Sequence, residues 1–258
     1  MDADIFALLA QDGVTNGAIY AVLALALVLV FAVTRIIFIP QGEFLAWGAL
    51  TMAALEAGHY PGTVWLLLGA GVITFATDLL GGAASRRRLG QSALWNLVYP
   101  VAVAAALYVT PLPELPQLVR VLVVLAIVVP LGPMIYRVAF QPVAEAPVLV
   151  LLIVSVALHL LMVGVGLLIF GPEGSRTQPF SEAQLAVGTL TLSGHTLVVL
   201  LASVALIIGL YLYFGRTLGG KALMATAINR NGARLMGISP ALAGRQTCFF
   251  AALTGALA

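Results

Sequence analysis

Hydrophobic residues along the chain come in long uncharged runs separated by short polar breaks. The first run, Ala18 to Val33, holds 16 residues without a charge, about 24 Å of helix at 1.5 Å per residue. With Asn16, Gly17 and Thr34 it reaches the length that a bilayer requires. The later runs predict six more complete spans and the start of an eighth, at residues 44–57, 63–80, 92–109, 118–136, 147–170, 196–214 and 246–258.

Two of these runs are short for a membrane span. Residues 44–57 follow an interruption by Pro40 and Gly42, and residues 246–258 number only 13. Because a helix needs about 20 apolar residues to cross a bilayer, we expect the natural protein to continue beyond Ala258. The whole pattern predicts an all-α fold: a polytopic transmembrane helical bundle that forms one domain over residues 1–258.

Composition agrees with a membrane protein and excludes several kinds of site. Only 9% of the residues are charged and the mean hydropathy is +1.09, far from the values of soluble domains. The single cysteine, Cys248, excludes an internal disulfide and a cysteine-cluster metal site, and no metal site is expected. No basic residue precedes Arg35, so a cleavable signal peptide is not expected and the first span would be retained as an anchor.

The basic residues predict the orientation of the chain in the membrane. The longest polar break, Gly215–Arg245, contains five of the twelve basic residues and no acidic residue. If this loop lies in the cytoplasm and successive spans alternate, ten of the twelve basic residues lie inside, and only Arg120 and Arg176 lie outside. By the positive-inside rule, this ratio predicts a cytoplasmic loop and an N-terminus outside.

The Gly215–Arg245 loop also has an amphipathic pattern. Read as one helix, it places three apolar residues on one face and two arginines on the opposite face: Met224, Ile228 and Leu235, then Arg230 and Arg234. Gly232 weakens the middle of this helix, and Gly237 with Pro240 ends it. Such an element would dock a soluble partner or lie on the lipid surface.

A nucleotide-binding motif in the same loop is incomplete. Gly215, Gly220 and Lys221 have the spacing of a P-loop, but Ala222 stands where a serine or threonine would hold magnesium. An apolar run precedes the motif instead of a buried strand. We therefore expect no cofactor on this chain, and any ATP would be bound by another chain.

Four stretches together resemble one family. They are DGVTNGAIYAVLALALVLVF at 12–31, IPQGEF at 39–44, YRVAFQPV at 136–143 and GKALMATAINRNGARLMGIS at 220–239. They are similar to the inner-membrane permeases of ABC importers for branched-chain amino acids, of the LivH type. Two features depart from the family pattern. Residues 82–117 read as an inserted hairpin connection, and Gln41-Gly42-Glu43 stands where His-Gly-Glu is common.

The resemblance implies a permease subunit of the bacterial inner membrane, incomplete at its C-terminus relative to the family. Its expected partners are a second permease subunit, two cytoplasmic ATPase subunits that carry ATP and Mg²⁺, a periplasmic solute-binding protein and the lipid bilayer. No nucleic acid is expected. In such permeases the loop forms a coupling helix that sits in a cleft on the ATPase. The coupling residues would be Met224, Ala227, Ile228, Arg230, Gly232, Arg234, Leu235 and Gly237.

Three polar residues are candidates for the solute pathway. Glu43 starts a short span after a proline–glycine break, as in transporters that build sites from broken helices, and inside the bilayer it would need a partner. It would equally favour a helix N-terminus near the interface through the helix dipole. Asn16 and Gln41 flank the first span; they would hydrogen-bond a passing solute, cap helices or bond across an interface.

Two further polar residues lie within spans. His159 has no carboxylate neighbour in its own span, which favours a hydrogen bond between helices. Asp78 lies about two turns before the run Arg86–Arg88, so a local ion pair would explain it. The sequence contains no combination of nucleophile and base that indicates catalysis, so we expect no enzymatic activity.

Other function classes stay open. A urea or short-chain amide importer would use a permease similar to this one. An ion-coupled secondary transporter would need charged residues in mid-span, where Glu43 is almost alone. A purely structural membrane subunit would not need a basic, glycine-hinged loop of this length.

Overall fold

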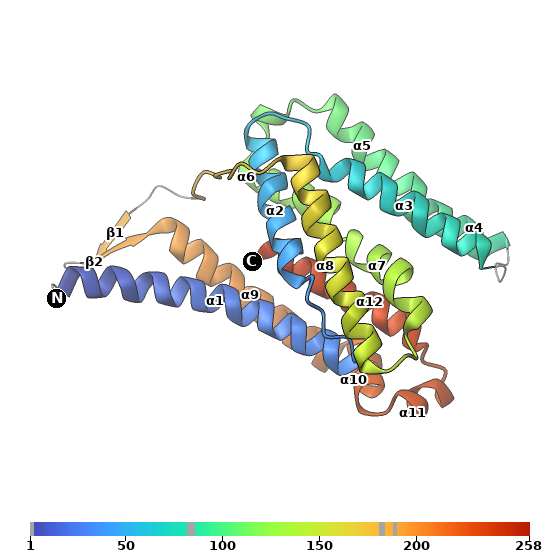
Figure 1. The fold of residues 1–258 in the computed structure, drawn as a ribbon. Coiled ribbons are helices and arrows are strands. Elements are labelled where there is room, and N and C mark those ends of the chain that lie inside the picture. Colours follow the sequence, from blue (N-terminus) through green and yellow to red (C-terminus); the bar gives the residue numbers. More distant parts are fainter. Residues whose placement is uncertain (1–2, 82–85, 181–183, 188–189) are drawn as a thin grey trace.

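Helices make up most of the computed structural model (Figure 1), which describes residues 3–81, 86–180, 184–187 and 190–258. Within these residues, six helical segments are long and apolar enough to cross a membrane: Leu9–Thr34, Thr63–Leu80, Leu89–Val109, Gln117–Val143, Val148–Phe170 and Gly194–Arg216. The predicted class, a helical membrane protein, is therefore confirmed.

The helical elements follow one another along nearly the whole chain. The first half contains α1 (Ala3–Thr34), α2 (Gln41–Glu56), α3 (Thr63–Leu80), α4 (Arg86–Ala93), the π-helix η1 (Leu94–Val98), α5 (Tyr99–Val109), the 3-10 helix η2 (Leu112–Glu114) and α6 (Gln117–Val128). The second half contains α7 (Leu131–Ile135), the π-helix η3 (Tyr136–Phe140), the 3-10 helix η4 (Gln141–Val143), α8 (Val148–Phe170), α9 (Gly194–Arg216), α10 (Leu218–Ile228), α11 (Arg230–Leu235) and α12 (Pro240–Leu257).

The helices α2 and α12 are not among the six long apolar segments, yet they lie in the interior of the bundle. α2 has 16 residues and α12 has 18, and α12 packs against α1, α2 and α7 (Figure 1). The buried face of α12 consists of small residues: Ala243, Gly244, Thr247, Cys248, Ala251, Ala252, Thr254 and Gly255. Small side chains let helix backbones approach closely, which favours helix association in membranes.

Two glycines of α12 show how close this packing is. The ring of Tyr136 occupies the space where Gly244 would carry a Cβ, and a Cβ on Gly255 would lie 2.7 Å from the Cβ of Phe44. α12 begins at Pro240, six residues before the predicted start of the eighth span at Gln246. The end of the predicted 215–245 loop therefore lies in a helix, because Pro240 at the first helical position is pre-organised to start one.

α1 and α9 form a pair whose free ends extend away from the other helices (Figure 1). Large apolar side chains on this pair are exposed, among them Tyr20, Val28, Leu201 and Tyr211. Before α9, the strands β1 (Gln184–Val187) and β2 (Leu190–Ser193) form an antiparallel pair in which Gln184 is opposite Ser193. The sequence predicted only a polar segment in this region.

The predicted hairpin connection over 82–117 is described in part. Residues 82–85 lie outside the described part of the chain. The remainder contains α4, η1 and α5, which return along α3 (Figure 1). Gly71 of α3 permits this approach, since a Cβ there would collide with the carbonyl oxygen of Asn96 in η1. That the hairpin is an insertion relative to a family stays a prediction.

Candidate functional site

The connection between α1 and α2 is an extended segment that leads into the bundle. α1 ends at Thr34, and Arg35 takes a left-handed backbone conformation with φ of 62°. From there exposed and buried residues alternate, and the side chains of Ile36 and Phe38 are buried. The backbone N–H of Ile39 donates a hydrogen bond to Ser155 Oγ of α8 at 3.0 Å. The alternate side chains and this hydrogen bond attach the segment to the bundle.

This break places the first turn of α2 against the middle of α8. His159 is the twelfth of the 23 residues of α8, and its Nδ1 lies 3.2 Å from Glu43 Oε1, with the Glu43 side chain 15% exposed. The two atoms are close enough for an ion pair, although their alignment does not meet hydrogen-bond geometry. Glu43 therefore has both features that its sequence suggested, a helix N-terminus and a partner.

Gln41 and Asn16 have different surroundings. Gln41 is buried, and its Nε2 donates to the carbonyl oxygen of Ala251 at 2.9 Å and lies 3.4 Å from Thr254 Oγ1. Gln41 thus forms a hydrogen bond across the α2–α12 interface, which was one of the roles that the sequence left open beside a contact with the solute. Asn16 is exposed on α1, 18 residues before the end of that helix, or about 27 Å along it. The structure brings Glu43 and Gln41 together at one helix start but does not place Asn16 with them.

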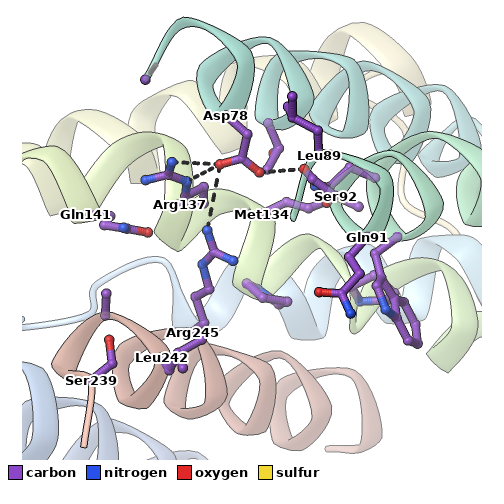
Figure 2. A pocket seen from close by; sticks show the side chains of 17 residues that line it. Asp78, Leu89, Gln91, Ser92, Met134, Arg137, Gln141, Ser239, Leu242 and Arg245 are labelled. Carbon is purple, nitrogen blue, oxygen red and sulfur yellow. Dashed lines mark hydrogen bonds and ion pairs between the residues drawn. The ribbon is translucent and has the colours of Figure 1, made fainter. Parts of the chain in front are cut away.

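A second polar group, which we call the Asp78 cluster, consists of Asp78, Ser92, Arg137 and Arg245 (Figure 2). Asp78 Oδ1 accepts from Arg137 at 2.6 Å, Asp78 Oδ2 accepts from Ser92 Oγ at 2.5 Å, and the Arg245 guanidinium lies 3.9 Å from Oδ1. The cluster ties α3, α4, η3 and α12 together at one end of the bundle.

The sequence did not reveal the Asp78 cluster, because it offered Arg86–Arg88 as the nearest cations along the chain. The side chains of those arginines lie outside the described part of the chain. Arg137 could have indicated the cluster from the sequence, because it is a charged residue within the long apolar segment Gln117–Val143. A charge in such a segment needs a counter-charge. Sequence separation hid the pairing, since Arg137 follows Asp78 by 59 positions.

The Asp78 cluster lines a pocket of about 800 Å³. Both π-helices contribute to its wall, η1 through Trp95 and Asn96 and η3 through Arg137. π-bulges within α-helices are frequent at functional sites. Gln141 also lines the pocket, and its buried Oε1 has no hydrogen-bond partner among the described residues.

The loop element is not the single amphipathic helix that the sequence predicted. It forms two short helices, α10 and α11, because Asn229 between them has an extended backbone with φ of −147°. The Asn229 side chain accepts a hydrogen bond from the N–H of Gly232 at 2.9 Å and so caps α11. Asparagine is a strong N-cap residue, and this preference moves the break from Gly232 to Asn229.

The predicted apolar face is consequently spread over two helices, although it is exposed as expected. We define the loop surface as Leu218, Met224, Ile228, Leu235 and Met236, whose side chains are 49% to 89% exposed. Ala227 is also exposed. Gly237 has a φ of 80°, a conformation that glycine adopts without strain, and it ends the element as predicted.

Arg230 and Arg234, which the resemblance assigns to coupling, make contacts within this chain. Arg230 donates to the carbonyl oxygen of Ala144 at 3.1 Å, and Arg234 forms an ion pair with Glu145. The hydrogen bond from Arg234 and its positive charge hold the pKa of Glu145 below its usual value. Both contacts fasten α11 to the turn that precedes α8.

Comparison of the chain with protein-family models, with curated proteins and with solved structures gives no match. The resemblance to LivH-type permeases therefore stays a prediction. Among the described residues, no group of three or more histidine, cysteine, aspartate and glutamate side chains is placed to hold a metal ion.

Proposed function

We propose that the chain is the membrane-spanning permease subunit of an ABC importer, with branched-chain amino acids as the transported solutes. The observation that carries this proposal is the loop surface on α10 and α11. Large apolar side chains outside the long apolar helices are exposed on an element that is capped and fastened to the rest of the chain. Contiguous exposed apolar groups of this kind mark interaction sites.

The contacts of α11 suggest how force from a partner would reach the interior. Arg230 and Arg234 connect α11 to Ala144 and Glu145, immediately before α8. α8 carries His159, which lies against Glu43 at the start of α2. A push on the loop surface would thus move α8 relative to α2, as the alternating access of an importer requires.

The proposal includes partners and a topology. The partners are a second permease subunit, a periplasmic binding protein and two ATPase subunits that bind ATP and Mg²⁺. The topology has an external N-terminus, seven spans including the short helix α2, and α12 as the beginning of an eighth, in the bacterial inner membrane. The ten-to-two distribution of basic residues supports this orientation.

The Glu43 carboxylate at the start of α2 favours a zwitterionic solute over a neutral one. Glu43 offers a carboxylate to the ammonium group of an amino acid, and the positive end of the α2 dipole would attract the carboxylate of that solute. Urea or a short amide is the nearest alternative within the permease class. Such a solute has no charged group that would pair with the Glu43 carboxylate or with the helix start.

One observation favours a second class, the ion-coupled secondary transporter. The Glu43–His159 pair lies in the middle of α8, and intramembrane carboxylates and histidines are common proton relays in transporters. A secondary transporter would take up solute in response to a pH gradient without ATP.

The test is reconstitution of the purified complex in vesicles with its ATPase subunits and binding protein. We expect leucine, isoleucine or valine with the binding protein to stimulate ATP hydrolysis, and solute to accumulate only when ATP is supplied. Stimulation by urea in place of amino acids would select the alternative solute. Accumulation driven by a pH gradient without ATP would overturn the importer assignment.

A further inference from the structure

A second pocket adjoins the one at the Asp78 cluster and differs from it in character. It has a volume of about 320 Å³ and its lining is nearly all apolar: Trp95, Tyr99, Leu125, Val129, Pro130, Pro133, Phe249 and Leu253. Trp95, Pro130 and Pro133 line both pockets, so the two are neighbours. Together they offer a polar compartment beside an apolar groove.

The polar compartment lies at the ends of the candidate membrane helices. Asp78 is two residues from the end of the segment Thr63–Leu80, and Ser92 is three residues after the start of Leu89–Val109. The apolar groove lies further along the same helices. On α12, Leu253 follows Arg245 by eight residues, about 12 Å of helix. The groove therefore runs from the membrane end toward the membrane interior.

Among the described residues that line it, the polar compartment carries one excess positive charge. Two arginines, Arg137 and Arg245, face the single carboxylate of Asp78. Arg137 satisfies this carboxylate directly at 2.6 Å, whereas Arg245 stands 3.9 Å away, too far for a hydrogen bond to it. The Arg245 guanidinium has five N–H donors in a fixed fork and, within the described part of the chain, makes only this long ion pair with Asp78, so it can also bind a phosphate in a bidentate manner.

Two further features fit the headgroup region of a lipid. Trp95, which lines both pockets, has its ring centroid 6.0 Å from that of Tyr99 in the apolar groove, and such aromatic side chains are enriched at the level of the headgroups. The buried Gln141 Oε1, which has no partner among the described residues, is an acceptor for a headgroup hydroxyl.

We propose that the two neighbouring pockets bind one anionic glycerophospholipid, with its phosphate at Arg245 and an acyl chain in the groove between Tyr99, Phe249 and Leu253. Basic pockets between membrane helices bind anionic headgroups by this combination of charge and apolar contact. The bound lipid would join α3, η1 and α12 at one end of the bundle. The site is independent of the solute and of the importer assignment.

The test uses the purified full chain in detergent and a fluorescent phosphatidylglycerol, with phosphatidylcholine as the neutral lipid. We expect phosphatidylglycerol to bind at least tenfold more tightly than phosphatidylcholine. Arg245→Gln should weaken phosphatidylglycerol binding about fivefold or more, the factor that corresponds to ~1 kcal/mol for one basic residue. The control Arg120→Gln, at the opposite end of the Gln117–Val143 segment and outside the pockets, should leave the affinity unchanged.

Two further measurements separate a lipid from a free anion and from a folding defect. Leu253→Trp fills the groove and keeps every charge, so it should also weaken phosphatidylglycerol binding while the thermal midpoint stays close to that of the wild type. Glycerol 3-phosphate, which has the phosphate but no acyl chain, should not displace the lipid. Equal binding of the two lipids, unchanged binding in Leu253→Trp, or full displacement by glycerol 3-phosphate would overturn the proposal.

Discussion

Glu43 is a largely buried carboxylate that lies at the start of a helix and beside a histidine. A charge at the bilayer centre costs roughly 2.5–3.5 kcal/mol on insertion scales. Glu43 lies in the first turn of α2, where the helix dipole favours a carboxylate, and it has His159 at 3.2 Å. Both interactions offset part of the cost of burying the Glu43 side chain.

Replacing Glu43 by glutamine tests whether the carboxylate lines the pathway. We expect Glu43→Gln to leave the amount of assembled protein unchanged and to reduce solute uptake about tenfold or more, a loss of about 1.4 kcal/mol in transition-state stabilisation. Radiolabelled uptake in vesicles measures the effect, with Glu114→Gln in the exposed turn at η2 as the control. Normal uptake would leave Glu43 with the role of a helix-capping group alone.

The contact between Arg234 and Glu145 predicts a dependence on pH. Arg234 lowers the pKa of Glu145 through a hydrogen bond and its charge. A carboxylate with a lowered pKa in the folded protein stabilises it above the pKa of the unfolded chain, and this contribution is lost as the pH falls through the folded pKa. Glu145→Gln should therefore lower the thermal midpoint slightly at neutral pH and have no effect in acid.

The effect of Glu145→Gln is expected to be small because both side chains of the pair are largely exposed. Thermal unfolding of wild type and variant across a pH series measures it. A difference between the two proteins that persists unchanged in acid would show that the ion pair is not its cause.

At the scale of elements, the Asn229 turn between α10 and α11 determines the shape of the loop surface. The turn sets the relative direction of the two helices, while Arg230 and Arg234 hold α11 against the turn before α8. The arginines are engaged within the chain, which leaves less of their charge for anionic lipid. The apolar side chains are what the element presents to a partner.

Removing the Asn229 cap tests whether the shape of the loop matters for coupling. Loss of an N-cap costs a helix about 1 kcal/mol, and a helix of only six residues has few backbone hydrogen bonds of its own to offset that loss. We expect Asn229→Ala to reduce solute-stimulated ATP hydrolysis and uptake together, while the ATPase subunits remain bound. Asn231→Ala is the matched control, an exposed asparagine in the same helix.

A bulky residue at Gly232 should act in the same direction, because a Cβ there would stand 3.2 Å from the Asn229 side chain that caps the helix. If the Asn229→Ala and Gly232→Leu variants both keep full solute-stimulated ATP hydrolysis and uptake with the ATPase bound, the proposed coupling role of α10 and α11 is wrong. A loop that lies on lipid would respond to Arg230→Ala and Arg234→Ala and not to these variants.

At the scale of the whole molecule, the proposed orientation depends on the distribution of charge. In a background of Cys248→Ala, we expect Glu114→Cys and Asn231→Cys to react with an impermeant thiol reagent from opposite sides of the membrane, Glu114→Cys from outside. Both positions are exposed. Labelling of both variants from outside in intact cells would contradict the proposed topology, and labelling of the cytoplasmic position only after permeabilisation would agree with it.

Long apolar stretches were sufficient to predict much of the fold. All six segments that can cross a membrane correspond to runs read directly from the sequence, because bilayer thickness imposes a minimum length that composition alone reveals. Which glycines pack closely was not evident from the sequence. A Cβ added to Gly13, Gly17 or Gly164 would meet no neighbouring atom within 4 Å, whereas Gly132, Gly244 and Gly255 are in tight contact.

The sequence by itself determined the membrane class, the long helices and the exposed apolar residues of the loop, since each depends on local hydrophobicity or charge. Only the tertiary structure decided which polar groups meet. Glu43 with His159 and Asp78 with Arg137 are separated by more than fifty residues and come together through helix packing. The tertiary structure also decided that α12 lies inside the bundle. Its small residues permit close contact with neighbouring backbones, and whether such contact forms depends on the neighbouring helices as much as on α12 itself.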